Sequence, residues 1–350
     1  MISRAFSLAA ALFLLSACAS APGGGQVPLT DAKIAEISEQ ADAGGFRGEI
    51  AFSLGKDAIY HASTDGIEAE QTWPWASVTK QIVATLVVQQ AERGTFALDD
   101  PVASYLPKLV GSEITWRELL QHRTPLPNPD ETATTDGWPA FYTDDQAPTF
   151  DWCARDLGTR PESGYRYNNC DYIVLGAALE KATGATLNDL FAERIAEPAK
   201  IIDAGFMAGG EEREFAVPEP LYRIILPRFG AAGGMVGPLS DMIRFDRALL
   251  EERLLPEDAL QTMWTGDPAL GYMALGQWAF DAPLEGCIGD VRIIERRGAI
   301  GKYQLRNIIL PDRGIILAMA TDQGEDTFSF GEVWSGSGFT FDILSTAACQ

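Results

Sequence analysis

Histidine and positive charge are scarce in this 350-residue sequence. It contains two histidines, His61 and His122, and 27 Lys and Arg residues against 49 Asp and Glu residues, a net charge of −22. Such a surface repels phosphates, which argues against nucleic acid, anionic lipid surfaces and polyanionic substrates as partners. No Gly-x-Ser-x-Gly stretch occurs and His61 falls on a strand-like stretch, so a Ser-His-Asp hydrolase is not favoured.

The cysteines lack the spacing of a metal or redox site. None of the five forms a Cys-x-x-Cys pair, so we expect no zinc site, no thiol-disulfide centre and no cofactor. In an exported protein, four of them can form two disulfides, with three possible connectivities. We expect sequence neighbours to pair, Cys153 with Cys170 and Cys287 with Cys349.

Long apolar runs are absent apart from one near the start. Residues 6–15 follow Arg4 and are too few for a bilayer span, and "LSAC" resembles the lipobox of bacterial lipoproteins. We expect residues 1–18 to be a signal peptide and lipobox with Cys18 lipidated, and residues 19–29 to be a flexible tether. This predicts a monomer in the bacterial cell envelope, facing the periplasm and held to the membrane by lipid alone. Ala19 favours the outer membrane over the inner one.

Residues 30–348 are long enough for one catalytic unit with a large core. Strand-like alternation occurs near both ends of this part, in a hairpin around residues 46–63 and again over residues 287–321. Residues 95–235 are mostly short helices and polar loops, of which residues 127–151 read as an exposed rim, and a final helix is expected from about Phe328 to Ala347. The sequence predicts an α/β (α+β) fold. Residues 30–94 and 236–348 would form an antiparallel sheet flanked by helices, with residues 95–235 as an inserted helical domain.

Ser77 and Lys80, in "WASVTKQI", stand three residues apart at the start of an apolar helical stretch. Residues i and i+3 share one face of a helix, so the two side chains project together. A serine hydroxyl needs a base, and lysine can serve when burial and nearby cations lower its pKa to about 7 or 8. A helix-capping serine beside an exposed lysine gives the same spacing, and Ser53 with Lys56 repeats it on a strand and its turn, so spacing alone decides nothing.

Tyr167 and Asn169, in "GYRYNNCDYIVLG", immediately precede a second apolar helix. A tyrosine can relay protons if neighbouring cations lower its pKa, and an asparagine amide can hold a substrate amide through one donor and one acceptor. Taken alone, the stretch is equally typical of a loop that caps a helix.

Four stretches together resemble the penicillin-recognising serine hydrolases, the class C β-lactamase-like family of β-lactamases, D-alanyl-D-alanine carboxypeptidases, D-aminopeptidases and some esterases. "WASVTKQI" is similar to the family's Ser-x-x-Lys motif and "YRYNN" to its Tyr-x-Asn motif. "TWRELLQHRTPLPNP" is similar to a segment usually ending in His-Thr-Ser-Gly-Leu-Pro, and "AAGGMVGPLSDMIRF" to an Ala-Gly-Gly stretch and its following helix. Their order agrees over residues 30–348.

The resemblance implies a β-lactamase/transpeptidase-like fold and acyl transfer through an acyl-enzyme. Ser77 would be acylated, Lys80 and Tyr167 would share the proton transfers, and Asn169 would hold the substrate amide. The backbone N–H groups of Ser77 and Ala299 would form the oxyanion hole.

The third family motif departs from the pattern. Where the family usually carries Lys or His, then Thr or Ser, then Gly, this sequence has Arg296, Arg297 and Gly298, which we expect to contact the substrate. Arg296 keeps a cation suited to a carboxylate, whereas Arg297 replaces a small hydroxyl and argues against efficient β-lactam hydrolysis. Lys302 is expected near the pocket mouth. Which arginine faces the pocket is left open.

The leading hypothesis is a serine hydrolase that acts on a small amide, ester or D-amino-acid peptide through Ser77, Lys80 and Tyr167. A D-Ala-D-Ala carboxypeptidase and a weak β-lactamase are alternatives that share the same three residues. A non-enzymatic alternative is a binding or scaffold lipoprotein on a degenerate hydrolase fold. Four polar site residues kept in register speak against a decayed site.

Overall fold

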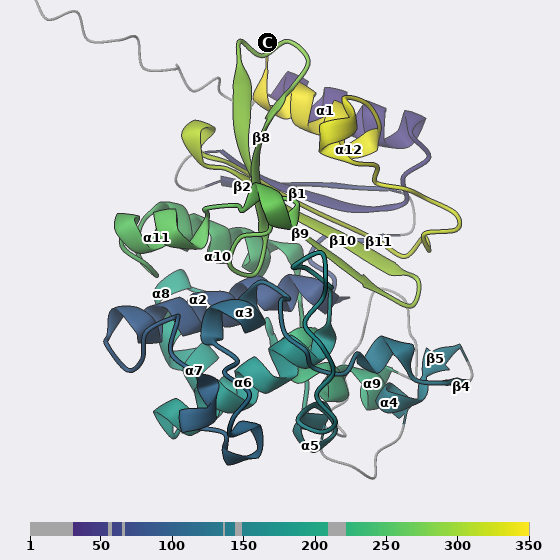
Figure 1. Ribbon diagram of the computed structural model, residues 1–350. Coiled ribbons are helices and arrows are strands. Elements are labelled where there is room, and N and C mark those ends of the chain that lie inside the picture. The colour runs from purple at the N-terminus through teal and green to yellow at the C-terminus, as the bar shows by residue number, and fades with distance from the viewer. Residues whose placement is uncertain are drawn as a thin grey trace, which may run out of the picture.

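The computed structural model describes residues 31–54, 58–64, 67–135, 137–143, 149–208 and 222–349 (Figure 1). The predicted signal peptide, the lipidation site at Cys18 and the tether lie outside the described residues, as does Lys56. No helix within the described ranges is both long and apolar enough to cross a membrane.

One antiparallel sheet of six strands is built from both ends of the described chain. Its order is β2-β1-β11-β10-β9-β8, so the first hairpin pairs with the last strand. The register joins Gly48 to Thr321 and Leu54 to Ile315, which confirms the predicted sheet. The strands are β1 Gly48–Leu54, β2 Ala58–Ser63, β8 Trp278–Pro283, β9 Asp290–Ile300, β10 Tyr303–Leu310 and β11 Ile315–Thr321.

Two smaller sheets and the helices complete the fold. The order in the second sheet is β3-β7-β6, and β4 pairs with β5. These short strands are β3 Trp73–Pro74, β4 Thr134–Thr135, β5 Trp138–Pro139, β6 Gly205–Phe206 and β7 Met235–Gly237. The helices are α1 Asp31–Ala43, α2 Thr79–Glu92, α3 Trp116–Leu120, α4 Ala140–Thr143, α5 Thr149–Cys153, α6 Asn169–Thr183, α7 Leu187–Phe191, α8 Glu197–Ala199, α9 Tyr222–Phe229, α10 Leu239–Leu250, α11 Glu257–Met263 and α12 Phe339–Ala348.

The six-stranded sheet is covered on both faces. Helices α1 and α12 lie over one face, and the remaining helices lie on the other side (Figure 1). Each strand sends alternate side chains to opposite faces, so Ile293 packs with the α1 and α12 core while Ile294 packs with the helical side. The helical side of the sheet, and not the α1 and α12 side, is therefore the face that meets Ser77 and Lys80.

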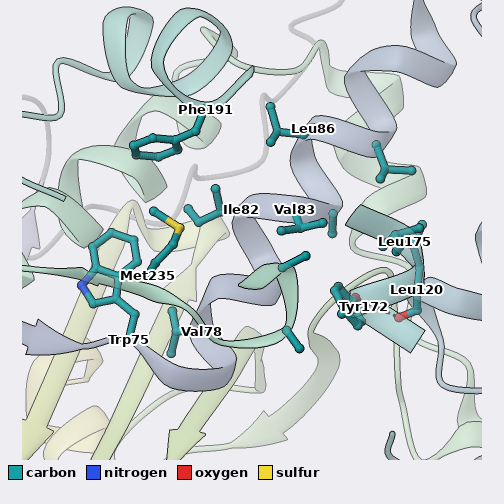
Figure 2. Close-up of a cluster of buried hydrophobic side chains, with 14 of the residues drawn as sticks. Trp75, Val78, Ile82, Val83, Leu86, Leu120, Tyr172, Leu175, Phe191 and Met235 are labelled. Atoms are coloured by element: carbon teal, nitrogen blue, oxygen red, sulfur yellow. Dashed lines mark hydrogen bonds between the residues drawn. The ribbon is translucent and has the colours of Figure 1, made fainter. Parts of the chain in front are cut away.

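Helix α2 is the centre of the larger core. Nearly every residue of α2 is buried, because neighbouring elements surround it. Figure 2 shows the α2 side chains Ile82, Val83 and Leu86 among residues of several other elements. These neighbours include Trp75, Leu120, Tyr172, Leu175, Phe191 and Met235. This packing holds the N-terminal end of α2 rigidly against the sheet.

Both predicted disulfides are formed, and each ties a helix to a distant segment. Cys153–Cys170 joins the end of α5 to the first turn of α6, and Cys287–Cys349 joins the β8–β9 connection to the end of α12. The pairing of sequence neighbours is confirmed.

Two local predictions were wrong. The last helix begins at Phe339 and not near Phe328, because Gly331, Gly336 and Gly338 adopt positive φ angles that interrupt a helix. The segment predicted as an exposed rim is partly core, since Phe141 and Tyr142 are buried beneath the helical part. Its aromatic residues therefore line the interior.

Candidate active site

The turn before α2 presents Ser77. A 3₁₀ turn, Ala76–Val78, precedes α2, and Ala76 has a φ of 45°, an uncommon conformation for a residue with a side chain. Ser77 therefore lies one short turn before the predicted helix and still shares a face with Lys80. Lys80 Nζ lies 3.0 Å from Ser77 Oγ.

Lys80 is fully buried and has three oxygen neighbours. Besides Ser77 Oγ, Nζ lies 2.8 Å from Asn169 Oδ1 and 2.6 Å from the carbonyl oxygen of Ala232. Ala232 belongs to the "AAGG" stretch, whose contribution is this backbone carbonyl. Sequence reasoning missed the carbonyl, since any residue type could supply it.

Tyr167 faces the same hydroxyl from the opposite side. Its Oη lies 2.5 Å from Ser77 Oγ, and Arg296 Nη2 donates to Oη over 3.3 Å. The structure therefore brings Ser77, Lys80, Tyr167 and Asn169 together, as the sequence predicted. They come from the start of α2 and the start of α6.

The pKa shifts assign different protonation states to the two groups beside Ser77. Burial, followed by the charge of Arg296, places the pKa of Lys80 well below its ordinary value, despite opposing effects of Asp130 and Asp171. Burial raises the pKa of Tyr167, and Arg296 offsets only part of this increase. Arg296 acts to lower the Tyr167 pKa, but the condition named for proton relay, a net lowering by cations, is not met, because burial dominates. Tyr167 is a neutral phenol at physiological pH, and Lys80 is the better base.

Arg296 and Arg297 point to opposite faces of β9. Arg296 is fully buried on the helical side, where Nε donates to the carbonyl of Ser77 over 3.0 Å. Arg297 lies on the other face, bonded to Glu295 over 3.0 Å and to Glu332 over 2.5 Å. Glu295 and Glu332 hold the guanidinium of Arg297, yet Arg297 also lines the cavity that contains Ser77, so its expected contact with the substrate stays a prediction.

Gly298 allows β9 to approach the turn that carries Ser77. A Cβ at this position would lie 2.6 Å from the Trp75 carbonyl oxygen, closer than real Cβ atoms come, and 3.3 Å from the Ser77 nitrogen, which is a tight contact. Strand β8 pairs with β9 only as far as Glu295, so at residues 296–299 the edge of β9 extends beyond β8. Since Tyr303 and Ile300 close the β9–β10 turn, alternation directs the N–H of Ala299 toward this edge.

Asp130 and Tyr142 extend the site beyond Asn169. Asn169 Nδ2 donates to Tyr142 Oη over 2.9 Å and lies 3.3 Å from Asp130 Oδ2, while the Tyr142 hydroxyl donates to Asp130 over 2.7 Å. Both residues come from the segment predicted as a rim, and sequence reasoning missed them. The clustering of aromatic and acidic residues in that segment was the available signal.

Most of these groups, though not the buried Lys80, line one open cavity of about 970 Å³. Its wall includes Ser77, Tyr167, Asn169, Asp130 and the edge of β9 beyond β8, and its rim includes Lys302, as predicted. Aromatic side chains form much of the remaining surface: Trp138, Tyr142, Phe229, Trp278, Phe328 and Phe330. The cavity can accept a substrate with apolar and polar parts.

Neither histidine contacts Ser77. His122 is buried beside Tyr167, with ring centroids 4.6 Å apart, and Nδ1 lies 3.1 Å from Asp171. His61 lies on β2 between Glu49 and Glu70. The described residues contain no cluster of His, Cys, Asp or Glu placed to hold a metal ion. Among the described residues, Lys80 and Tyr167 are the titratable groups that contact Ser77 Oγ.

Comparisons with known proteins agree with this arrangement. The profile of the family described as Beta-lactamase matches residues 46–334. Penicillin-binding protein 4* of Bacillus subtilis (strain 168) is 22% identical over 319 residues, covering 81% of this chain and 69% of its own length. Esterase EstB of Burkholderia gladioli is 35% identical over 187 residues, covering 49% of this chain and 47% of EstB, so this match spans less than half of that relative.

A solved structure shows the same fold. The D-stereospecific amidohydrolase from Streptomyces sp. superposes with a TM-score of 0.68 at 24% identity, covering 91% of this chain and 99% of that one. Together with the profile match over most of the sequence, the fold and the Ser77–Lys80–Tyr167 cluster lead to one conclusion. The chain belongs to the Beta-lactamase family and is a serine hydrolase.

Proposed function

We propose that the protein hydrolyses small amides, esters or short peptides through an acyl-enzyme on Ser77, with Lys80 as base and Tyr167 as proton donor. The observation that carries the proposal is the placement of Ser77 Oγ, 3.0 Å from Lys80 Nζ and 2.5 Å from Tyr167 Oη. Both distances permit direct proton transfer.

The neighbours of Lys80 fix the direction of the first transfer. A neutral amine has two N–H donors and one lone pair, and the two acceptors Asn169 Oδ1 and Ala232 O can take both donors. The lone pair then faces Ser77 Oγ, whose hydroxyl donates to it. Lys80 accepts this proton as Ser77 attacks the substrate carbonyl, and Tyr167, a neutral phenol, donates its proton to the leaving group.

The backbone completes the mechanism. The N–H groups of Ser77 and Ala299 would stabilise the oxyanion, because Gly298 lets β9 approach the Ser77 turn. Transfer of the Lys80 proton back to Tyr167 restores the phenol after the leaving group departs. In the second half, water replaces the leaving group and reverses these roles, releasing the acid and free Ser77.

We further propose that β-lactam hydrolysis is weak or absent. Arg297 pairs with Glu295 and Glu332, and Arg296 donates through Nε to the Ser77 carbonyl and through Nη2 to Tyr167, which leaves Nη1 of Arg296 without a hydrogen-bond partner among the described residues. To gain a second arginine N–H group, a substrate carboxylate would have to compete with these partners. A carboxypeptidase that recognises a terminal carboxylate is disfavoured for the same reason.

Covalent labelling tests the proposal directly. Intact-mass analysis would follow reaction of the purified protein with a fluorophosphonate and, separately, with a penicillin, for the wild type and for Ser77→Ala and Lys80→Ala. We expect a fluorophosphonate adduct on the wild type that is absent in Ser77→Ala and slow in Lys80→Ala. No adduct on folded wild type would overturn the proposal, and rapid penicillin turnover would overturn its β-lactam part.

We also propose that the protein works as a lipoprotein in an oxidising cell envelope. The lipobox-like "LSAC" and the two disulfides support this location. Metabolic labelling with a radioactive fatty acid should mark the wild type and not Cys18→Ala. Equal labelling of both would contradict a lipid on Cys18.

A further inference from the structure

Asp130 carries a negative charge inside the active-site cavity that no described cation pairs with. Its carboxylate accepts the Tyr142 hydroxyl over 2.7 Å and lies 3.3 and 3.4 Å from Asn169 Nδ2. Both donors are uncharged. These hydrogen bonds therefore fix the orientation of the carboxylate without neutralising it, although Asp130 remains exposed to the cavity.

The nearby arginines do not neutralise this charge. Arg296 is buried between the Ser77 carbonyl and Tyr167, and Arg297 pairs with Glu295 and Glu332 on the other face of β9. The cavity thus offers a substrate an oriented carboxylate, while Arg297 and two of the three guanidinium nitrogens of Arg296 are engaged with protein partners.

The surroundings of Asp130 also suit a cation. Tyr142 stacks on Phe229 with ring centroids 3.9 Å apart, and both line the cavity together with Trp138. Aromatic faces attract ammonium groups, and a carboxylate beside them adds a charge-assisted hydrogen bond. Aromatic rings next to an uncompensated carboxylate form a binding surface for an amine.

Asp130 lines the same cavity as Ser77 and is linked to it by a short chain of contacts. Asp130 contacts Asn169, Asn169 contacts Lys80, and Lys80 contacts Ser77. Burial and Arg296 act most strongly on the pKa of Lys80, but the charge of Asp130 also acts on it, so its field reaches the base. In an amino-acyl substrate the α-nitrogen lies only about 2.5 Å from the carbonyl carbon.

We propose that Asp130 binds a positively charged amine on the acyl part of the substrate, which makes amino-acid amides, esters and peptides with a free amino group the preferred substrates. The proposal rests on the acyl-enzyme function proposed for Ser77 and names its substrate class. Asp130 acts as a specificity residue, because its contact is with the substrate amine and not with the scissile bond.

A matched pair of substrates tests the proposal. kcat/KM would be measured for the p-nitroanilides of D-alanine and N-acetyl-D-alanine, with p-nitrophenyl acetate as a neutral reference. We expect the wild type to prefer the free amine, and Asp130→Asn to lose about tenfold or more on that substrate alone. The wild-type preference should also fall as pH rises through the substrate amine pKa, about 8.

Two control variants separate recognition from general effects of charge. Glu131→Gln removes a charge from the adjacent residue, whose side chain lines a different cavity, and Asp326→Asn removes one from another part of the same cavity. Both should leave the ratio of the two anilides within about twofold of the wild type. An equal change in this ratio for Asp326→Asn and Asp130→Asn would contradict a local contact.

The outcomes distinguish this proposal from the underlying function. If the wild type shows neither labelling of Ser77 nor turnover of p-nitrophenyl acetate, the proposed function itself is overturned. If both persist, equal losses on the two anilides in Asp130→Asn, or a wild-type preference for the acetylated one, would overturn amine binding. Should Asp130→Asn fail to fold, the wild-type preference and its pH dependence decide alone.

Discussion

Arg296 and Arg297 are adjacent in sequence and identical in type, yet they belong to different parts of the molecule. Arg296 lies on the helical face of β9 and contacts the Ser77 carbonyl and Tyr167. Arg297 lies on the α1 and α12 face and contacts Glu295 and Glu332. Because side chains alternate along a strand, one step in sequence separates a residue beside the nucleophile from one that stabilises the fold.

The contrast extends to the charges around each arginine. On the far face, Arg297 and Arg306 share the buried carboxylate of Glu295 and Arg297 also pairs with Glu332, so two cations meet two carboxylates and charge is balanced locally. Toward Ser77, the hydrogen bonds of Arg296 within the described part of the chain go to the Ser77 carbonyl and Tyr167 and to no carboxylate, and its charge lowers the pKa of Lys80. A cation without a carboxylate partner can lower the pKa of a neighbouring base, whereas a paired carboxylate cancels this effect. Substitutions on the two faces should therefore affect different measurements.

Arg296→Ala should have the largest effect, a loss of about 10³-fold in kcat/KM. It removes the donor to Tyr167 and one of the two causes that lower the pKa of Lys80, after burial. Lys80 must then lose its proton at higher pH, so the acidic limb of the pH–rate profile should move upward. Arg296→Lys keeps the charge and should keep the limb near its wild-type position. An unchanged limb in Arg296→Ala would show that Arg296 does not tune Lys80.

Gly298→Ala should follow, with a loss of about 100-fold in kcat/KM. The added Cβ would fall 2.6 Å from the Trp75 carbonyl, so the Ser77 turn and β9 must separate. A displacement of about 1 Å at a reacting group costs a factor of this size. Steady-state kinetics with p-nitrophenyl acetate would measure it, with circular dichroism to verify folding. Full activity would mean that the oxyanion hole does not require this close approach.

Arg297→Ala should leave kcat/KM within about threefold of the wild type and reduce the free energy of unfolding by about 1–2 kcal/mol. Glu295 is fully buried and would keep only Arg306, 2.7 Å away, as a cationic partner. Urea unfolding and kinetics on the same sample would separate the two effects. A large loss of activity at unchanged stability would reverse the assignment of the two faces.

The comparison also explains what the sequence could and could not predict. Ser77 with Lys80, and Tyr167 with Asn169, stand in short local patterns, so their roles follow from spacing and resemblance. The face of β9 on which Arg296 lies depends on the strand register, which is set by pairing with β10. Gly298, two residues later, lies on the same face, where the Ser77 turn approaches the strand. The sequence did contain a sign that no helix begins at Phe328, because three glycines follow it within ten residues.

Long-range contacts account for the rest. The Ala232 carbonyl meets Lys80 across 152 residues, and Asp130 meets Asn169 across 39. The aromatic residues clustered near Asp130 are a local signal, but they do not specify that the loop folds inward, because burial of Tyr142 depends on its stacking partner Phe229 in α9. Such partners become visible only once the helical part is assembled.

Substitution of His61 should have the smallest effect. It tests whether a charge on the helical face of the sheet, but far from Ser77, affects catalysis. It pairs with Ala51 on the face that packs with the helical core, but on β2, at the edge of the sheet opposite β8. Burial lowers its pKa, but Glu49 and Glu70 outweigh burial and raise it above 6.5. The charged form therefore stabilises the fold fully below about pH 6.5, and this contribution is lost as pH rises through the higher folded pKa.

Urea unfolding should show that the wild type is more stable than His61→Gln at pH 5.5 and that this difference shrinks by pH 8.5. The change should be less than about 1 kcal/mol, and kcat/KM should be unchanged. A change in kcat/KM would show that position on this face matters more than distance from the nucleophile.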